Sequence, residues 1–276
     1  MKTTVGAGRG ERNAQFAAGA LTLGTVGIAV VEIFGIGTLL PAAIHVQAAA
    51  FLLLFLSLSS LVAFILTRRH ATAAFLIGVF TVLVGWRIVA LADLTLTMIA
   101  CGATFLAYCL AFVGHARSAL LAGHASGATV HLTFFRLYLG LDLVPHFSEK
   151  LFAGPVPRNE DVAAFESLGV PFPLAFVLVA GLVECAAAIG VGLGLLTRLA
   201  APATVTYLMI ATVMGGHFSL GFIWASPGGG WEYPLLWSVL ILTFLFGGGR
   251  WLSLDAELAR LRIVPRWAKP LLARAI

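Results

Sequence analysis

Eight long apolar segments, separated by short polar or charged stretches, dominate the pattern of hydrophobic and polar positions along the chain. About 20 apolar residues suffice for a helix to cross a bilayer. Lipid offers no hydrogen-bond partners, so each segment must be helical to satisfy its own backbone. The pattern therefore predicts an all-α, polytopic membrane protein with eight transmembrane helices, at about residues 15–38, 44–66, 71–92, 94–114, 128–147, 172–195, 198–220 and 232–248.

The Lys and Arg residues are distributed unevenly between the two sides of these segments. Thirteen of the 17 precede the first segment, follow the eighth, or lie in loops on the same side as both termini. Lys150 and Arg158 lie in loops of the other side, and Arg87 and Arg136 lie within spans. Because basic loops are retained in the cytoplasm, we expect both termini to be cytoplasmic and the chain to cross the bacterial inner membrane several times.

A polar stretch of small residues at 115–127 divides the chain into two parts. We expect a four-helix membrane module at 1–127, a second four-helix bundle at 128–258 and an amphipathic cytoplasmic tail at 259–276. The basic and apolar residues of the tail are typical of a helix that lies on an anionic leaflet. Residues 148–171 are predicted to form one long outer loop, which is either a docking cap or a solvated connector.

Composition agrees with lipid as the main solvent. Of the 276 residues, 60% are hydrophobic and only 11% are charged, and the mean hydropathy is +1.01. These values exclude a secreted disulfide scaffold, a disordered chain and a nucleic-acid-binding protein. The three cysteines lie in apolar runs without CxxC spacing, so we interpret them as core thiols.

Two ionisable residues within the second bundle, Arg136 and Glu184, lie at similar depth. A charge at the centre of a bilayer costs about 2.5–3.5 kcal/mol, so such residues usually face a partner. The depths of these two differ by roughly 5 Å at 1.5 Å per residue. We therefore predict a buried ion pair between Arg136 and Glu184, which is either a structural clamp or part of a catalytic site.

A second set of polar residues is predicted at the outer surface. Asp142, His146 and Lys150 follow i, i+4, i+8 spacing, which places them on one face of a continuous helix. His217 and Glu232 are expected at the same depth, at the ends of neighbouring spans. Together the five residues could line a pocket for a quinone head group or substrate, with His or Lys donating to a carbonyl and a carboxylate moving protons. The alternative is that each side chain extends individually to water.

No dedicated cofactor or metal motif is present in the sequence. His45, His146 and His217 fall near the outer side, but they do not form the spaced intramembrane pair that a b-type haem needs. We therefore expect no metal site, and quinone is the candidate cofactor.

Four segments between residues 131 and 258 carry a set of motifs in a characteristic order: FFRLYLGLDLVPHFSEKLF, LVECAAAIGVGLGLLTRLAAP, MGGHFSLGF and GGGWEYPLLWSVLILTFLFGGGRWLSLD. This order resembles the DoxX/DoxD family of integral membrane proteins over a little under half of the chain. The matching positions are Arg136, Gly140, His146, Lys150, Glu184, Gly194, Thr197, Arg198, His217, Glu232 and the run Leu252–Asp255. The four N-terminal spans extend beyond the usual size of the family.

The resemblance implies a four-helix membrane bundle. One branch of the family is a subunit of thiosulfate:quinone oxidoreductase, and other members accompany membrane redox or biosynthetic complexes. We therefore expect a membrane subunit of a quinone-linked redox complex, in contact with the lipid bilayer and with protein partners but not with nucleic acid.

Two other functions stay open. The chain could be a non-catalytic scaffold or assembly subunit of a larger membrane complex, or a transporter for a small solute. Eight helices without an inverted repeat speak against transport. Whether the chain takes part in catalysis is left open by its residues alone.

Overall fold

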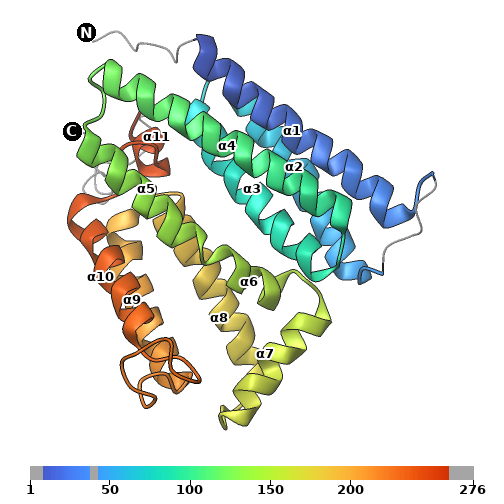
Figure 1. Cartoon of the computed structure of the whole chain (residues 1–276), viewed down its shortest axis with the longest axis vertical. Helices are drawn as coiled ribbons and strands as arrows, with labels where there is room; N and C mark the ends of the chain where they lie inside the picture. The colour runs from blue at the N-terminus through green and yellow to red at the C-terminus, as the bar shows by residue number, and fades with distance from the viewer. Residues whose placement is uncertain (1–8, 38–42, 261–276) are drawn as a thin grey trace. The chain divides into compact units, whose positions relative to one another are not determined.

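The computed structural model describes residues 9–37 and 43–260, and the regular elements in these ranges are helices (Figure 1). In chain order they are α1 (Arg9–Phe34), α2 (Val46–Leu66), α3 (Ala71–Leu91), α4 (Thr95–Leu121), α5 (Gly127–Leu141), α6 (Val144–Leu151), α7 (Pro155–Ser167), α8 (Pro173–Ala187), the π-helix η1 (Ala188–Gly192), α9 (Thr197–Met214), α10 (Glu232–Gly247) and α11 (Leu254–Arg260). The predicted tail at 259–276 lies almost entirely outside the described residues.

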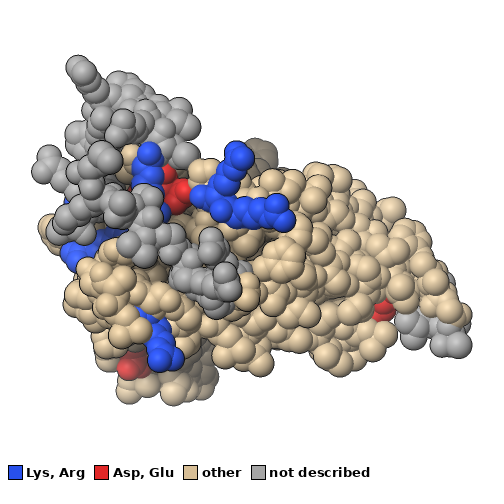
Figure 2. Space-filling model, turned by 90° about the horizontal axis from the view of Figure 1, so that it is seen from above, with Lys and Arg blue, Asp and Glu red and all other residues tan. Residues whose placement is uncertain are grey.

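Several of these helices confirm that the chain is a multi-pass membrane protein. On the face drawn in Figure 2, Lys, Arg, Asp and Glu occupy only small areas of the described surface. The helix α10 is apolar but shorter than a full span. The eight spans and the cytoplasmic termini remain predictions. Within the described chain, five segments are long and apolar enough to cross a membrane: Asn13–Phe34, Val46–Leu66, Ala71–Leu91, Thr95–Leu121 and Pro173–Gly192.

The contacts divide the chain into two compact units, at residues 1–131 with 152–154 and at 132–151 with 155–276. The first unit contains α1–α4, and α1 packs along α4. Buried hydroxyls join these two helices, because Thr22 lies 3.2 Å from the Tyr108 hydroxyl and Thr25 lies 3.1 Å from Thr104. Such bonds satisfy polar groups that lipid would leave unpaired.

Glu32 illustrates how the first unit uses a charge at a helix end. Its carboxylate accepts hydrogen bonds from Leu96 N at 3.0 Å, Thr97 N at 2.8 Å and Thr97 Oγ1 at 2.7 Å. These donors belong to the first turn of α4, whose N–H groups have no partners within the helix. Glu32 therefore caps α4 and holds α1 against it.

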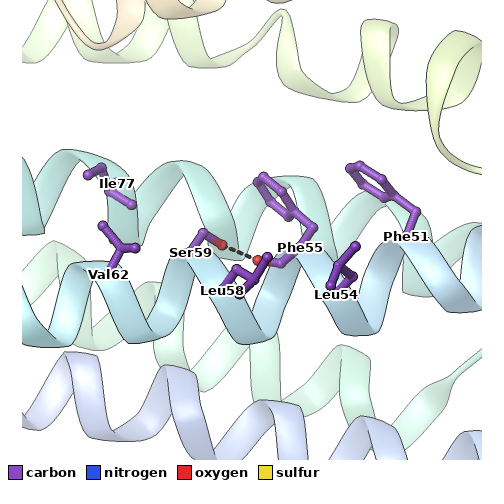
Figure 3. Close-up of a pocket in the computed structure, with 7 residues that line it drawn as sticks. All are labelled: Phe51, Leu54, Phe55, Leu58, Ser59, Val62 and Ile77. Carbon is purple, nitrogen blue, oxygen red and sulfur yellow. Dashed lines mark hydrogen bonds between the residues drawn. The ribbon is translucent and has the colours of Figure 1, made fainter.

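An apolar groove of about 410 Å³ lies along α2, beside Ile77 of α3. Figure 3 shows the rings of Phe51 and Phe55 beside each other, and Ser59 directed at the Phe55 carbonyl, to which its hydroxyl donates. Because the one hydroxyl of the lining is already bonded within α2, the groove offers a hydrocarbon surface of the kind that lipid chains cover.

The second unit is built around α5, α8, α9 and α10 (Figure 1). Its apolar core contains Leu139, Val191, Ala201, Ile241 and Phe244. The backbones of α5 and η1 touch, because a Cβ added to Gly140 would lie 2.0 Å from the Gly192 nitrogen. Small residues at these positions allow that approach, as is common between membrane helices.

Two expectations for this unit were wrong. The segment predicted as one span at 128–147 is broken, since α5 ends at Leu141 and α6 begins at Val144. Pro145 explains the break, because proline is tolerated in a first helical turn but not in a helix interior. The segment predicted as a loop at 148–171 contains α7, and Pro155 and Pro157 occupy its first turn.

Candidate functional site

Arg136 is fully buried where α5 meets the end of η1. Its Nη1 donates to the carbonyls of Val191 at 3.0 Å and Gly192 at 2.5 Å, and its Nη2 donates to the Leu252 carbonyl at 2.6 Å. A π-helix and the turn after it leave carbonyls without helical partners, and the guanidinium supplies donors for them. Arg136 therefore connects three segments that are distant in the sequence.

Gly194 makes room for this guanidinium. Its φ is +76°, and a Cβ at this position would lie 2.5 Å from Arg136 Nη1. Glycine is the residue that combines this backbone conformation with such a close approach.

Asp255 lies beside the Arg136 network and caps α9. Its carboxylate accepts from Leu196 N at 2.7 Å, Thr197 N at 3.1 Å and Thr197 Oγ1 at 3.0 Å. Burial raises the pKa of Asp255, while the bonds from Thr197 and Leu196 and the charge of Arg136 act in the opposite direction. The negative charge at this helix N-terminus is also favoured by the helix dipole.

Glu184 is paired with Lys150, so the predicted ion pair with Arg136 was wrong. Lys150 Nζ lies 3.1 Å from Glu184 Oε2, and both side chains are less than a tenth exposed. The Tyr207 hydroxyl donates to Glu184 Oε1 at 2.6 Å. The Nη atoms of Arg136 instead bind backbone carbonyls, and the depth argument failed because it ignored which faces of the helices meet.

We call this group of three side chains the Lys150–Glu184–Tyr207 site, and three helices contribute to it. Lys150 is on α6, Glu184 on α8 and Tyr207 on α9. Gly181 allows α6 to lie against α8, because a Cβ there would lie 3.0 Å from the Lys150 Cβ. The Lys150 ammonium also donates to the His146 carbonyl at 3.2 Å.

Some buried oxygen atoms at this site could accept further hydrogen bonds. The atoms Asp161 Oδ2 and Glu184 Oε2 are buried and have no hydrogen bond of good geometry within the described part of the chain. Burial raises the pKa of Asp161, the charge of Lys150 lowers it, and the charges of Glu149 and Glu184 raise it. Buried polar atoms without protein partners commonly mark the place of a water or ligand.

His217 and Glu232 belong to a separate group at the start of α10. His217 Nδ1 lies 3.0 Å from the Gly228 carbonyl and 3.1 Å from the Gly229 carbonyl, so this nitrogen must be the donor. Glu232 accepts a hydrogen bond from Trp224 N at 3.1 Å, and the Trp224 ring lies 5.6 Å from His217. These contacts order the loop between α9 and α10.

The five residues predicted to share one pocket are thus distributed differently. Asp142 lies in the break between α5 and α6, so it does not continue a helical face with Lys150. His146 is exposed, whereas Lys150 is buried and paired. Contacts join His217 to Glu232 through Trp224, and Lys150 to Glu184 and Tyr207. Among the described residues, no group of three or more His, Cys, Asp and Glu is placed to hold a metal ion.

Sequence reasoning missed Tyr207 and Asp161 as members of the site. Tyr207 is the one tyrosine of the α9 segment, and a phenol in an apolar helix is a weak signal for a polar partner. Asp161 is one acid among several between α6 and α8, and only the formation of α7 distinguishes it.

The comparison with protein families finds a match for part of the second unit. Residues 131–217 match the family model described as DoxX. No curated protein and no solved structure matches the chain. The matched range contains Arg136, Lys150, Glu184 and Tyr207, whereas Asp255 and its capping role lie beyond it.

Proposed function

The chain is a multi-pass membrane protein with a DoxX domain at residues 131–217, and we propose that it is the membrane subunit of a quinone-linked redox complex. The Lys150–Glu184–Tyr207 site would bind the quinone head group. The site differs from the predicted pocket, because Asp142, His146, His217 and Glu232 are not part of it.

The observation that carries this proposal is a connected set of three ionisable side chains inside an apolar helical bundle, of which Lys150 and Glu184 are buried and Tyr207 is partly buried. Lys150 and Glu184 are 8% and 6% exposed. Ionisable groups in such a setting are expensive and typically serve a function. The Asp161 Oδ2 atom, whose carboxyl is close enough to Lys150 and Glu184 to interact with their charges, adds capacity for a polar ligand.

Each residue would have a defined role. The Lys150 ammonium has three N–H groups, and the His146 carbonyl and Glu184 are two acceptors beside it, so the third N–H can donate to a ligand carbonyl. Tyr207 would donate to Glu184 or to the ligand, and Glu184 would exchange a proton with the ligand. A bound quinone takes up two electrons, from the redox centre of a partner subunit, and two protons.

The most direct test compares Tyr207→Phe with Tyr138→Phe. Tyr138 is a matched control, because it is on α5 and about half exposed. The protein would be purified in mild detergent, extracted with organic solvent and assayed for quinone. We expect near-stoichiometric quinone in the wild type and in Tyr138→Phe. Loss of one hydrogen bond in Tyr207→Phe should reduce quinone retention about tenfold.

A scaffold or assembly subunit is the second candidate. It is favoured by the fact that Lys150 and Glu184 already satisfy each other's charge and join α6 to α8. In that case the wild type carries no quinone, and Tyr207→Phe leaves the set of co-purifying proteins unchanged. Such a result would contradict the quinone proposal.

A further inference from the structure

A cavity with both polar and apolar walls lies in the second unit, where α5 meets the end of α10. Its volume is about 210 Å³, and its walls include Thr133, Arg136, Thr243, Phe246 and Arg250. The Gly247–Gly249 turn completes the lining. None of these residues belongs to the Lys150–Glu184–Tyr207 site.

Two arginines of the lining have donors to spare. The Nε atoms of Arg136 and Arg250 are buried and have no hydrogen-bond partner within residues 9–37 and 43–260. Arg136 is 0% exposed. A buried guanidinium N–H without an acceptor is costly, so an acceptor from a ligand or water is expected here.

The side chains around the cavity carry more positive than negative charge. Arg136 and Arg250 both line it, and Arg198 Nη2 lies 3.5 Å from the carbonyl of Phe246, another lining residue. Asp255 is the carboxylate whose charge acts on Arg136. The remaining positive charge favours an anionic ligand, and guanidinium groups suit phosphate oxygens in particular.

We propose that this cavity binds a phosphate group. A water molecule takes up about 30 Å³ of liquid volume, so the cavity has room for a tetrahedral anion. The same chemistry has two sources, a phospholipid head group or free phosphate. The apolar walls formed by Phe244 and Phe246 favour the phospholipid.

The test measures binding to the purified full chain by native mass spectrometry in a neutral detergent. Arg250→Gln removes one of the two guanidinium groups that line the cavity and leaves Arg136, with its bonds to backbone carbonyls, in place. Arg260→Gln is the matched control, because the Arg260 side chain is 69% exposed and outside the cavity. The probes are dioleoylphosphatidylglycerol, dioleoylglycerol and inorganic phosphate, so that the phosphate group is separated from the acyl chains.

We expect the wild type and Arg260→Gln to bind one phosphatidylglycerol in preference to dioleoylglycerol, and Arg250→Gln to bind it about tenfold more weakly. If inorganic phosphate binds with the same dependence on Arg250 and the lipid does not, free phosphate is the ligand. Equal binding of each probe by all three proteins, or no binding, would overturn the proposal. A thermal unfolding transition of Arg250→Gln like that of the wild type excludes misfolding as the cause of a loss of binding. The outcome is independent of the quinone test.

Discussion

Lys150 on α6 and Glu184 on α8 form a buried ion pair, with 3.1 Å between Nζ and Oε2. The pair lies within residues 131–217, which match the DoxX family model, and Tyr207 on α9 adds a hydrogen bond to the same carboxylate. The arrangement connects three helices through one carboxylate, so the stability of the second unit and the proposed ligand site depend on the same atoms.

Replacing one partner of this pair should destabilise the protein more than replacing both. Lys150→Met or Glu184→Gln leaves a buried polar group or charge uncompensated, and either change should destabilise the protein by about 3–5 kcal/mol. The double variant should recover part of that loss. Thermal unfolding of the four proteins in one detergent measures this coupling. Additive effects of the two single changes would show that the pair does not interact.

Gly140→Ala should strongly destabilise the second unit. The added methyl would meet the backbone of Gly192 at 2.0 Å, and backbone cannot move aside as a side chain can. Overpacking of this kind costs about 1–3 kcal/mol or more. Gly27→Ala is the matched control, because nothing lies within 4 Å of its Cβ position. A melting temperature for Gly140→Ala equal to that of the control would contradict the close approach of α5 and η1.

Asp255→Ala should lower stability by about 2 kcal/mol, because three donors of the α9 N-terminus lose their acceptor. Asp255→Asn retains one carbonyl oxygen and should have a smaller effect. Glu257→Gln serves as the control, since Glu257 pairs with the exposed Arg260. Chemical denaturation of the three variants checks this order. The cap is not important if Asp255→Ala behaves like Glu257→Gln.

The stability of the protein should depend on pH through Asp161. Burial raises the pKa of this carboxyl in the folded state above its ordinary value. The folded state therefore binds the proton more tightly than the unfolded state. This contribution to stability is present at low pH and is lost as the pH rises through the raised pKa.

Asp161→Asn mimics the protonated form and should remove this dependence. The melting temperature of the wild type should fall relative to that of Asp161→Asn as the pH increases across that window. Glu160→Gln, a change at an exposed neighbour, should follow the wild type. A difference between wild type and Asp161→Asn that is constant with pH would show that the carboxyl is not desolvated.

The pattern of apolar residues was sufficient to predict an all-helical membrane protein, and the order of motifs between residues 131 and 258 was sufficient for the resemblance to DoxX. Each predicted span overlaps at least one described helix, but the predicted span at 128–147 is divided between α5 and α6 near Pro145, and the predicted loop at 148–171 contains α7. Hydropathy indicates how long an apolar segment is and that it lies in lipid. It does not indicate where a helix ends within a polar stretch. A proline there can start a new helix as readily as it ends one.

The partners of the buried charged residues could not be predicted from the sequence. Depth along a helix follows from counting residues, and by that measure Arg136 and Glu184 are equivalent neighbours. Their partners are decided by the rotation of each helix and by close approaches at Gly140, Gly181 and Gly194. Helix rotation and these close approaches place Arg136 beside backbone carbonyls of η1 and place Glu184 beside Lys150. The amino-acid order alone thus determines that charges must be paired within the bundle, because lipid cannot solvate them. Packing of the helices selects each partner, because an ion pair needs side chains to meet within about 4 Å.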